Sequence, residues 1–190
     1  MLTTFDKIVI GALVGIIILN IAFQIYIRLP SDEVEEEDIL IVFYNEKKWE
    51  YTLSELQDID EYSGTGSMMT QMGIKGPYNF TGIRFNELFH DLKINGGTLG
   101  AWVIAADGYN MTFTSAELQG NITVFDESGN SSDALVRLLL VYSQDGVLLE
   151  REDGPLRLAY VGDCNCVTPA SYWIKQVREI TFFKEVNNLL

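Results

Sequence analysis

The fold is decided by a stretch that reads Gly76-Pro77-Tyr78-Asn79-Phe80-Thr81-Gly82-Ile83-Arg84-Phe85-Asn86-Glu87-Leu88-Phe89. At its end, Phe85, Leu88, Phe89 and Leu92 recur at spacings of three or four, which predicts a helix over residues 85–92 with one apolar face. Around this helix most of the apolar pattern has the shorter period of strands. The predicted fold class is therefore α+β, rich in strands and with short helices.

Strands are predicted on both sides of this stretch. They occupy residues 39–44, 48–53, 102–106, 109–114, 136–142, 156–161 and 172–183. Asp107-Gly108 supplies the turn of a hairpin between two of them. Short helices are predicted at 115–118 and at 54–57, where Ser54 begins a capping box. With no internal repeat, residues 39–190 form one predicted domain.

The N-terminus predicts a membrane anchor. Residues 8–27 read IVIGALVGIIILNIAFQIYI and contain no charge, a length that spans the hydrocarbon core of a bilayer as a helix. A cleaved signal peptide is the alternative, but its apolar region is shorter and small residues mark its cleavage site. The sequence therefore predicts an uncleaved transmembrane anchor over residues 1–28. Residues 29–38, with the acidic run Ser31 to Asp38, are a predicted solvated linker.

Four N-x-[ST] sequons, at Asn79, Asn110, Asn121 and Asn130, favour a location outside the cytoplasm. Lys7 and Arg28 flank the two ends of the apolar run, so charge hardly decides its orientation. We expect a single-pass membrane protein, and a glycoprotein, with its domain on the extracytoplasmic side.

The composition excludes several classes of function. The chain has 13 Lys and Arg against 27 Asp and Glu, a net charge of −14, so it would repel nucleic acids. It has 2 Cys and 1 His, which excludes a four-ligand zinc site and a cysteine-rich scaffold. The lone histidine, His90, lies near the end of the predicted helix, and we interpret it as a surface residue.

Five segments in order resemble the molybdopterin-binding domain of the sulfite oxidase family. They are Thr52–Leu56, Gly76–Phe89, Ala105–Tyr109, Gly154–Leu158 and Trp173–Ile180. The resemblance covers about residues 48–184. It implies a mixed α+β domain around a curved sheet, a pyranopterin-bound molybdenum ligated by one cysteine thiolate, and electron transfer to a membrane redox partner.

Two positions depart from the family pattern. The family's cysteine falls in residues 62–71, which contain none, and the thioether of Met68 is a poor substitute for a thiolate. The family's lysine before the last tryptophan is replaced by Tyr172. The phosphate of a bound cofactor would then need Lys75, Arg84 or backbone amides.

The resemblance places a cofactor pocket between residues 63–72, the turn at 107–109 and the loop at 162–167. Its expected cofactor-binding residues are Ser67, Met68, Asp107, Tyr109, Asp163 and Cys164, and its expected metal ligands are Cys164 and Cys166. For Cys164-Asn165-Cys166 three interpretations stay open. They are a local disulfide, two buried thiols, or soft ligands for a metal.

Two functions follow from these observations. The first is a membrane-anchored molybdopterin-dependent oxidoreductase of unknown substrate. The second is a non-catalytic module that kept the fold, lost the molybdenum ligand, and binds a small ligand or a protein.

Overall fold

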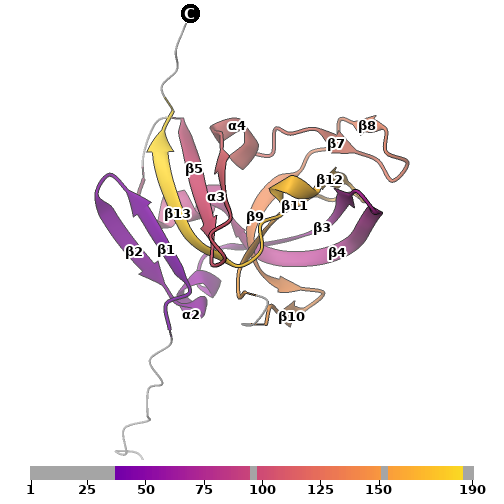
Figure 1. Cartoon of the computed structure of the whole chain (residues 1–190). Helices are drawn as coiled ribbons and strands as arrows, with labels where there is room; N and C mark the ends of the chain where they lie inside the picture. The colour runs from indigo at the N-terminus through magenta and orange to yellow at the C-terminus, as the bar shows by residue number, and fades with distance from the viewer. Residues whose placement is uncertain (1–36, 95–97, 151–153, 186–190) are drawn as a thin grey trace, which may run out of the picture. The chain divides into compact units, whose positions relative to one another are not determined.

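The computed structural model describes residues 37–94, 98–150 and 154–185 (Figure 1). They belong to a compact unit that spans Glu36–Leu190. The predicted anchor over residues 8–27, and nearly all of the acidic linker, lie outside these described residues. Among the described residues, no helix has the length and apolarity needed to cross a membrane.

The first sheet has five strands in the order β2-β1-β13-β5-β6. Their bounds are β1 Leu40–Tyr44, β2 Lys47–Tyr51, β5 Leu99–Ala105, β6 Asn110–Phe113 and β13 Val177–Lys184. The chain's last long strand pairs in parallel with its first, and the other pairs are antiparallel. The predicted hairpin is confirmed, with its turn at residues 106–109.

The second sheet has eight strands and curls back on itself (Figure 1). Its path is β10-β9-β4-β3-β12-β7-β8, and β11 pairs with β9. The bounds are β3 Glu61–Thr70, β4 Gly73–Arg84, β7 Val124–Phe125, β8 Ser131–Ser132, β9 Arg137–Gln144, β10 Val147–Leu148, β11 Arg157–Val161 and β12 Val167–Pro169. Just after β11, Gly162 exchanges two backbone hydrogen bonds with Thr65 of β3. Strands β3, β4, β9 and β11 therefore form a closed ring.

Two apolar cores lie on the two faces of this ring. The small core consists of Phe80, Leu139, Val141, Ala159, Val161 and Trp173. The large core includes the alternate residues of the same strands and packs them against the five-stranded sheet. On β9, Leu138, Leu140 and Tyr142 belong to the large core, whereas Leu139 and Val141 belong to the small one. The continuous apolar run at 136–142 thus reflects a strand buried on both faces.

The long hairpin of β3 and β4 was not predicted as such, because Gly76-Pro77 looks like a strand breaker. The register of the hairpin shifts between Gly66 and Met68, opposite this Gly-Pro pair. A bulge is a place where a strand tolerates a proline, which has no N–H to donate.

The helices are short: α2 Leu53–Gln57, α3 Phe85–Asp91, α4 Ser115–Leu118 and the 3₁₀ turn η1 Ala170–Tyr172. The capping box of α2 begins at Thr52 and closes on Glu55, two residues before the predicted Ser54. Helix α3 has its predicted apolar face, and Phe89 packs edge-on to Phe182 with ring centroids 4.7 Å apart. The strand-rich α+β class is confirmed.

Candidate functional site

Two predicted cofactor-binding residues, Ser67 and Met68, lie on β3 in the segment where the resemblance places the family's cysteine. Ser67 is covered, and Met68 is partly exposed. Ser67 is 2% exposed, and its backbone N–H donates to the carbonyl of Cys166 at 3.0 Å. A Cβ built on Gly76 would lie 2.9 Å from the Ser67 Oγ, so the opposing strand closes over this side chain. Met68, the next residue, lines an open cleft.

This cleft, which we call the basic cleft, has a volume of about 470 Å³. Three cationic side chains line it, those of Lys75, Arg157 and Lys175, and Glu150 is the acidic one among its described lining residues. Its apolar lining includes Met68, Val147, Leu148 and Leu149, of which Val147 and Leu148 are exposed. In a chain of net charge −14, this grouping of cations creates a local site for an anion.

Arg157 is positioned by the small core beneath it. Its guanidinium lies 5.4 Å from the ring centroid of Phe80 and 5.6 Å from that of Trp173. Its Nη1 donates to the Gln144 Oε1 at 3.1 Å. The aromatic faces stabilise the cation, and the packing limits its rotamers. Arg157 is therefore a preorganised charge, whereas Lys75 and Lys175 are exposed.

A second cleft contains the predicted turn residues. Asp107 and Tyr109 line it together with Trp173, Lys175 and Gln176, in a volume of about 340 Å³. Lys175 lines both clefts, while Met68 lines only the basic one. The structure therefore brings Met68 and the turn residues to neighbouring clefts rather than to one pocket.

The cysteine loop is covalently closed. Cys164 and Cys166 are joined by a disulfide, which is the first of the three interpretations of this motif. The loop is attached to β3, because the Thr65 Oγ1 donates to the Cys164 carbonyl at 2.8 Å and the Tyr62 hydroxyl donates to Asp163 at 3.2 Å. None of Asp163, Cys164 and Cys166 lines either cleft.

Tyr172, at the position of the family's lysine, packs away from both clefts. Its hydroxyl donates to the Glu117 Oε1 at 3.1 Å, and its ring stands edge-on to Tyr160 with centroids 5.5 Å apart. Burial, followed by the nearby Glu117 carboxylate, raises the pKa of Tyr172 above its usual value. This position contributes a neutral hydroxyl to the packing of α4.

Sequence reasoning missed the role of two cations, Arg157 and Lys175. Both lie inside segments that resemble the sulfite oxidase family, yet neither was a predicted site residue. A signal was available for Arg157, because it begins the buried strand Arg157–Val161 and a charge at such a position needs a specific partner.

The residues present do not fit molybdenum. The metal of the family needs a thiolate, but the sulfur in the basic cleft is a thioether, and the two cysteine sulfurs are bonded to each other. Among the described residues, no cluster of three His, Cys, Asp or Glu side chains could hold a metal ion. The cations of the cleft fit the phosphate of a pterin cofactor, but the ligand set does not fit its metal.

Comparison with known proteins supports the fold. No family model matches the chain, and no curated protein matches its sequence. The crystal structure of the sulfane dehydrogenase SoxCD from Paracoccus pantotrophus is similar, with a TM-score of 0.55 and 14% identity over 79% of this chain. The match spans 39% of the SoxCD chain. The likeness is one of fold, and it supports the sulfite-oxidase-like architecture predicted from the sequence.

Proposed function

We propose that this domain binds a phosphate-bearing organic anion in the basic cleft, as a binding module that does not use molybdenum. The observation that supports this proposal is the donor set of the cleft: Lys75, Arg157 and Lys175 gather there without a thiolate. The cleft therefore has the positive charge needed to bind an anion. It lacks the thiolate that would bind the metal.

The shape of the cleft favours an anion with an organic body over inorganic phosphate. Arg157 supplies a fixed positive charge for a phosphate, and the two exposed lysines add charge at the rim. Met68, Val147 and Leu148 offer apolar surface to a ring or chain attached to that phosphate.

Phenyl phosphate is a suitable probe, with phenol and inorganic phosphate as its two halves. We expect the full-length protein to bind phenyl phosphate more tightly than either half in calorimetric titration. Lys75→Gln combined with Lys175→Gln should weaken binding by about tenfold or more, because two charge-assisted contacts are lost. Lys48→Gln is the matched control, since Lys48 is exposed on β2 and pairs with Glu50. An unchanged affinity in the double variant would disprove the proposal.

A molybdopterin-dependent oxidoreductase with a membrane redox partner is the second candidate, and the likeness to sulfane dehydrogenase favours it. It requires a thiolate, so the cysteine loop would have to be reduced and rearranged. The direct measurement is molybdenum per chain in protein made by a host with intact cofactor synthesis. Met68→Cys is the informative variant because it places a thiol in the basic cleft. Molybdenum acquired only by this variant would show that the cleft lacks nothing but the ligand.

We also propose that residues 8–27 anchor the protein and that its domain lies outside the cytoplasm. The local disulfide supports this, because disulfides persist in oxidising compartments. The four sequon asparagines are all exposed, so glycan could be attached to each of them. N-terminal sequencing of the mature protein should begin at Met1 or Leu2, and a start beyond Ile27 would contradict the anchor. In a host that glycosylates, glycosidase treatment should shift the protein on a gel.

A further inference from the structure

An amphipathic pocket of about 420 Å³ lies apart from the basic cleft, beside the large core. Its walls come from the end of β4 and α3, the start of β5, α4, and the start of β9. It shares no lining residue with the basic cleft. Tyr62 lies beneath the arginines of this pocket, and Met68 lines the basic cleft. The two residues are six positions apart on β3, which separates the two sites by about 20 Å along the strand.

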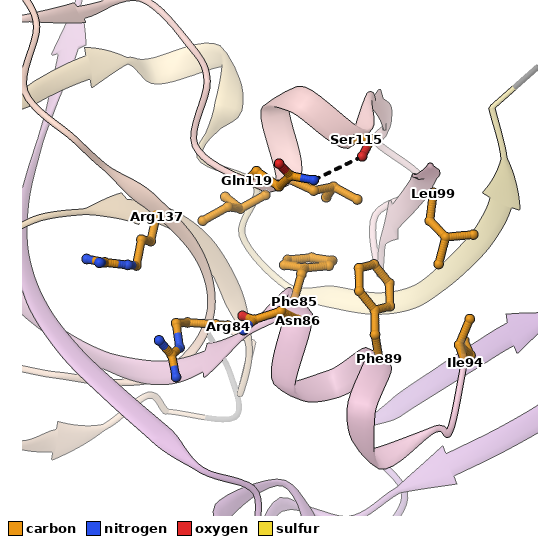
Figure 2. A pocket seen from close by; sticks show the side chains of 11 residues that line it. Arg84, Phe85, Asn86, Phe89, Ile94, Leu99, Ser115, Gln119 and Arg137 are labelled. Atoms are coloured by element: carbon orange, nitrogen blue, oxygen red, sulfur yellow. Dashed lines mark hydrogen bonds between the residues drawn. The ribbon is translucent and has the colours of Figure 1, made fainter. Parts of the chain in front are cut away.

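The lining of this pocket changes from charged to apolar along its length. Figure 2 shows Arg84 and Arg137 at one end, the rings of Phe85 and Phe89 between, and Ile94 and Leu99 at the other end. Leu118 and Leu138 add to the apolar wall, and none of the described lining residues is acidic. A pocket of this polarity suits a molecule with one anionic group and an apolar body.

The two arginines converge on one aromatic ring. The Arg84 guanidinium lies 5.5 Å from the ring centroid of Tyr62, and that of Arg137 lies 5.1 Å from the same centroid. Arg137 also donates from Nη1 to the Tyr62 hydroxyl at 3.0 Å. Two like charges on one ring repel each other, and an anion between them would remove that repulsion.

The charges at this end are only partly neutralised. Arg84 Nη2 pairs with Glu87 at 2.6 Å, but the buried Arg84 Nε has no hydrogen-bond partner. Among the described residues, no carboxylate lies within ion-pair distance of Arg137. Glu185 accepts a hydrogen bond from the Ser115 backbone at 2.8 Å and so lies by the α4 wall, away from the arginines as Figure 2 places Ser115.

From these contacts we infer that the pocket is a binding site for a small organic carboxylate with an apolar body, such as an aryl-substituted or medium-chain acid. The carboxylate binds the guanidinium groups of Arg137 and Arg84, and the body packs against Phe85, Phe89 and Leu99. Ser115 and Gln119, which hydrogen-bond to each other at 3.3 Å, provide polar groups for a substituent on that body.

The test compares 3-phenylpropionate with 3-phenylpropan-1-ol, a neutral analogue of similar shape, on the full-length protein. We expect the acid to bind at least about tenfold more tightly, because charged hydrogen bonds to the arginines are lost with the alcohol. Arg137→Gln should abolish that preference. Arg178→Gln, which removes an exposed arginine on β13, and Lys75→Gln should leave it unchanged. Equal binding of acid and alcohol, or a preference that survives Arg137→Gln, overturns the inference.

A second measurement does not depend on the folding of a variant. In methyl NMR spectra of the unmodified protein, 3-phenylpropionate should shift the signals of Ile94 and Leu99 but not those of Val147 and Leu148. Shifts confined to Val147 and Leu148 would assign the acid to the basic cleft and overturn the inference. Because phenyl phosphate and the two lysine substitutions test the other cleft, failure of one proposal is distinguishable from failure of the other.

Discussion

The small and large cores share strands but support different kinds of site. Beneath the basic cleft, the small core fixes one buried arginine, Arg157, against the rings of Phe80 and Trp173. At the pocket beside the large core, Arg84 and Arg137 share one partly exposed ring, that of Tyr62, which itself packs against the small core. In both regions an aromatic face contacts the cation, and Arg84 is also paired with the Glu87 carboxylate. In so acidic a chain these cations attract a ligand that brings its own negative charge.

The difference lies in what surrounds the charge. Arg157 is 9% exposed and forms part of the packing, so its removal would disturb both the core and the site. Arg137 is half-buried and lies at the edge of a cavity, so its removal should affect binding more than stability. The predictions that follow test this contrast.

The largest effect is expected from Trp173→Ala. Trp173 is 8% exposed, stands edge-on to Phe80 at 5.3 Å, and donates from Nε1 to the buried Thr168 hydroxyl at 2.8 Å. We expect a loss of about 3–5 kcal/mol in the free energy of unfolding, measured with urea. Affinity for phenyl phosphate should fall as well, because Arg157 loses a supporting ring.

Trp102→Ala is the matched control for that substitution. Trp102 is 42% exposed on β5, and its Nε1 donates to Asn110 at 3.2 Å. Its loss should cost about 1 kcal/mol or less. Equal losses for the two tryptophans would show that the small core does not support the cleft.

Leu139→Ala and Leu140→Ala test whether β9 separates two real cores. These neighbours are 0% and 1% exposed and face opposite sides of the strand. Each substitution should cost about 2–5 kcal/mol, since each opens a cavity in a packed core. A strand with one solvated face would give one large and one small loss, and that result in urea unfolding would contradict the two-core arrangement.

The raised pKa of Tyr142, a residue of the large core, predicts that the protein loses stability at high pH. Burial, followed by donation of its hydroxyl to the Glu61 Oε2 at 2.9 Å, raises the pKa of Tyr142 to about 12 from the usual 10.0. Its contribution is therefore fully present below pH 10 and is lost as pH rises from about 10 through 12. Tyr142→Phe should flatten the fall in unfolding free energy between about pH 9 and pH 11.5, whereas an unchanged slope would assign it to other groups.

The sequence predicted most of the strands because their signals are local. Runs such as Ile39–Tyr44 and Val136–Tyr142 are apolar and β-branched, and the spacing of Phe85 and Leu88 is helical. The β3–β4 hairpin was missed because its glycines and Pro77 resemble loop signals. They are tolerated there because Gly66 and Gly82 face close backbone carbonyls, where a Cβ would lie 2.4 Å and 2.2 Å from the oxygens of Tyr160 and Leu140. Such close approaches depend on distant strands and leave no local signal.

The candidate site was predicted less well than the fold. The resemblance implies that residues 63–72 and 162–167 lie near one another, and they do lie side by side, with Ser67 aligned to Val167. The arginines on aromatic rings could not be predicted, because each contact joins residues far apart in the chain, such as Arg157 with Phe80. The side of β3 on which the cysteine loop lies likewise depends on tertiary contacts, so the local sequence does not predict it.

A small stability effect, and the sharpest functional contrast, is expected from the cysteines. The disulfide closes a loop with a sequence separation of 2, so chain entropy predicts a contribution of only about 1–2 kcal/mol. Cys164→Ser should therefore lower unfolding free energy by about that amount. The affinity for phenyl phosphate should stay unchanged, because the loop lines neither cleft.

The same variant distinguishes the two proposed functions. A binding module predicts no molybdenum in the unmodified protein, with or without reductant, and none in Cys164→Ser or Cys166→Ser. An oxidoreductase predicts about one molybdenum per chain in reduced protein and its loss in one of the two variants, because one thiolate ligates the metal. Elemental analysis of the three proteins, prepared in parallel with reductant, decides between these outcomes. One outcome would be a metal content near one per chain that a single serine substitution abolishes. It would mean that the cysteine loop rearranges toward the basic cleft on reduction. The contrast between a binding cleft and a structural disulfide would then hold only for the oxidised protein.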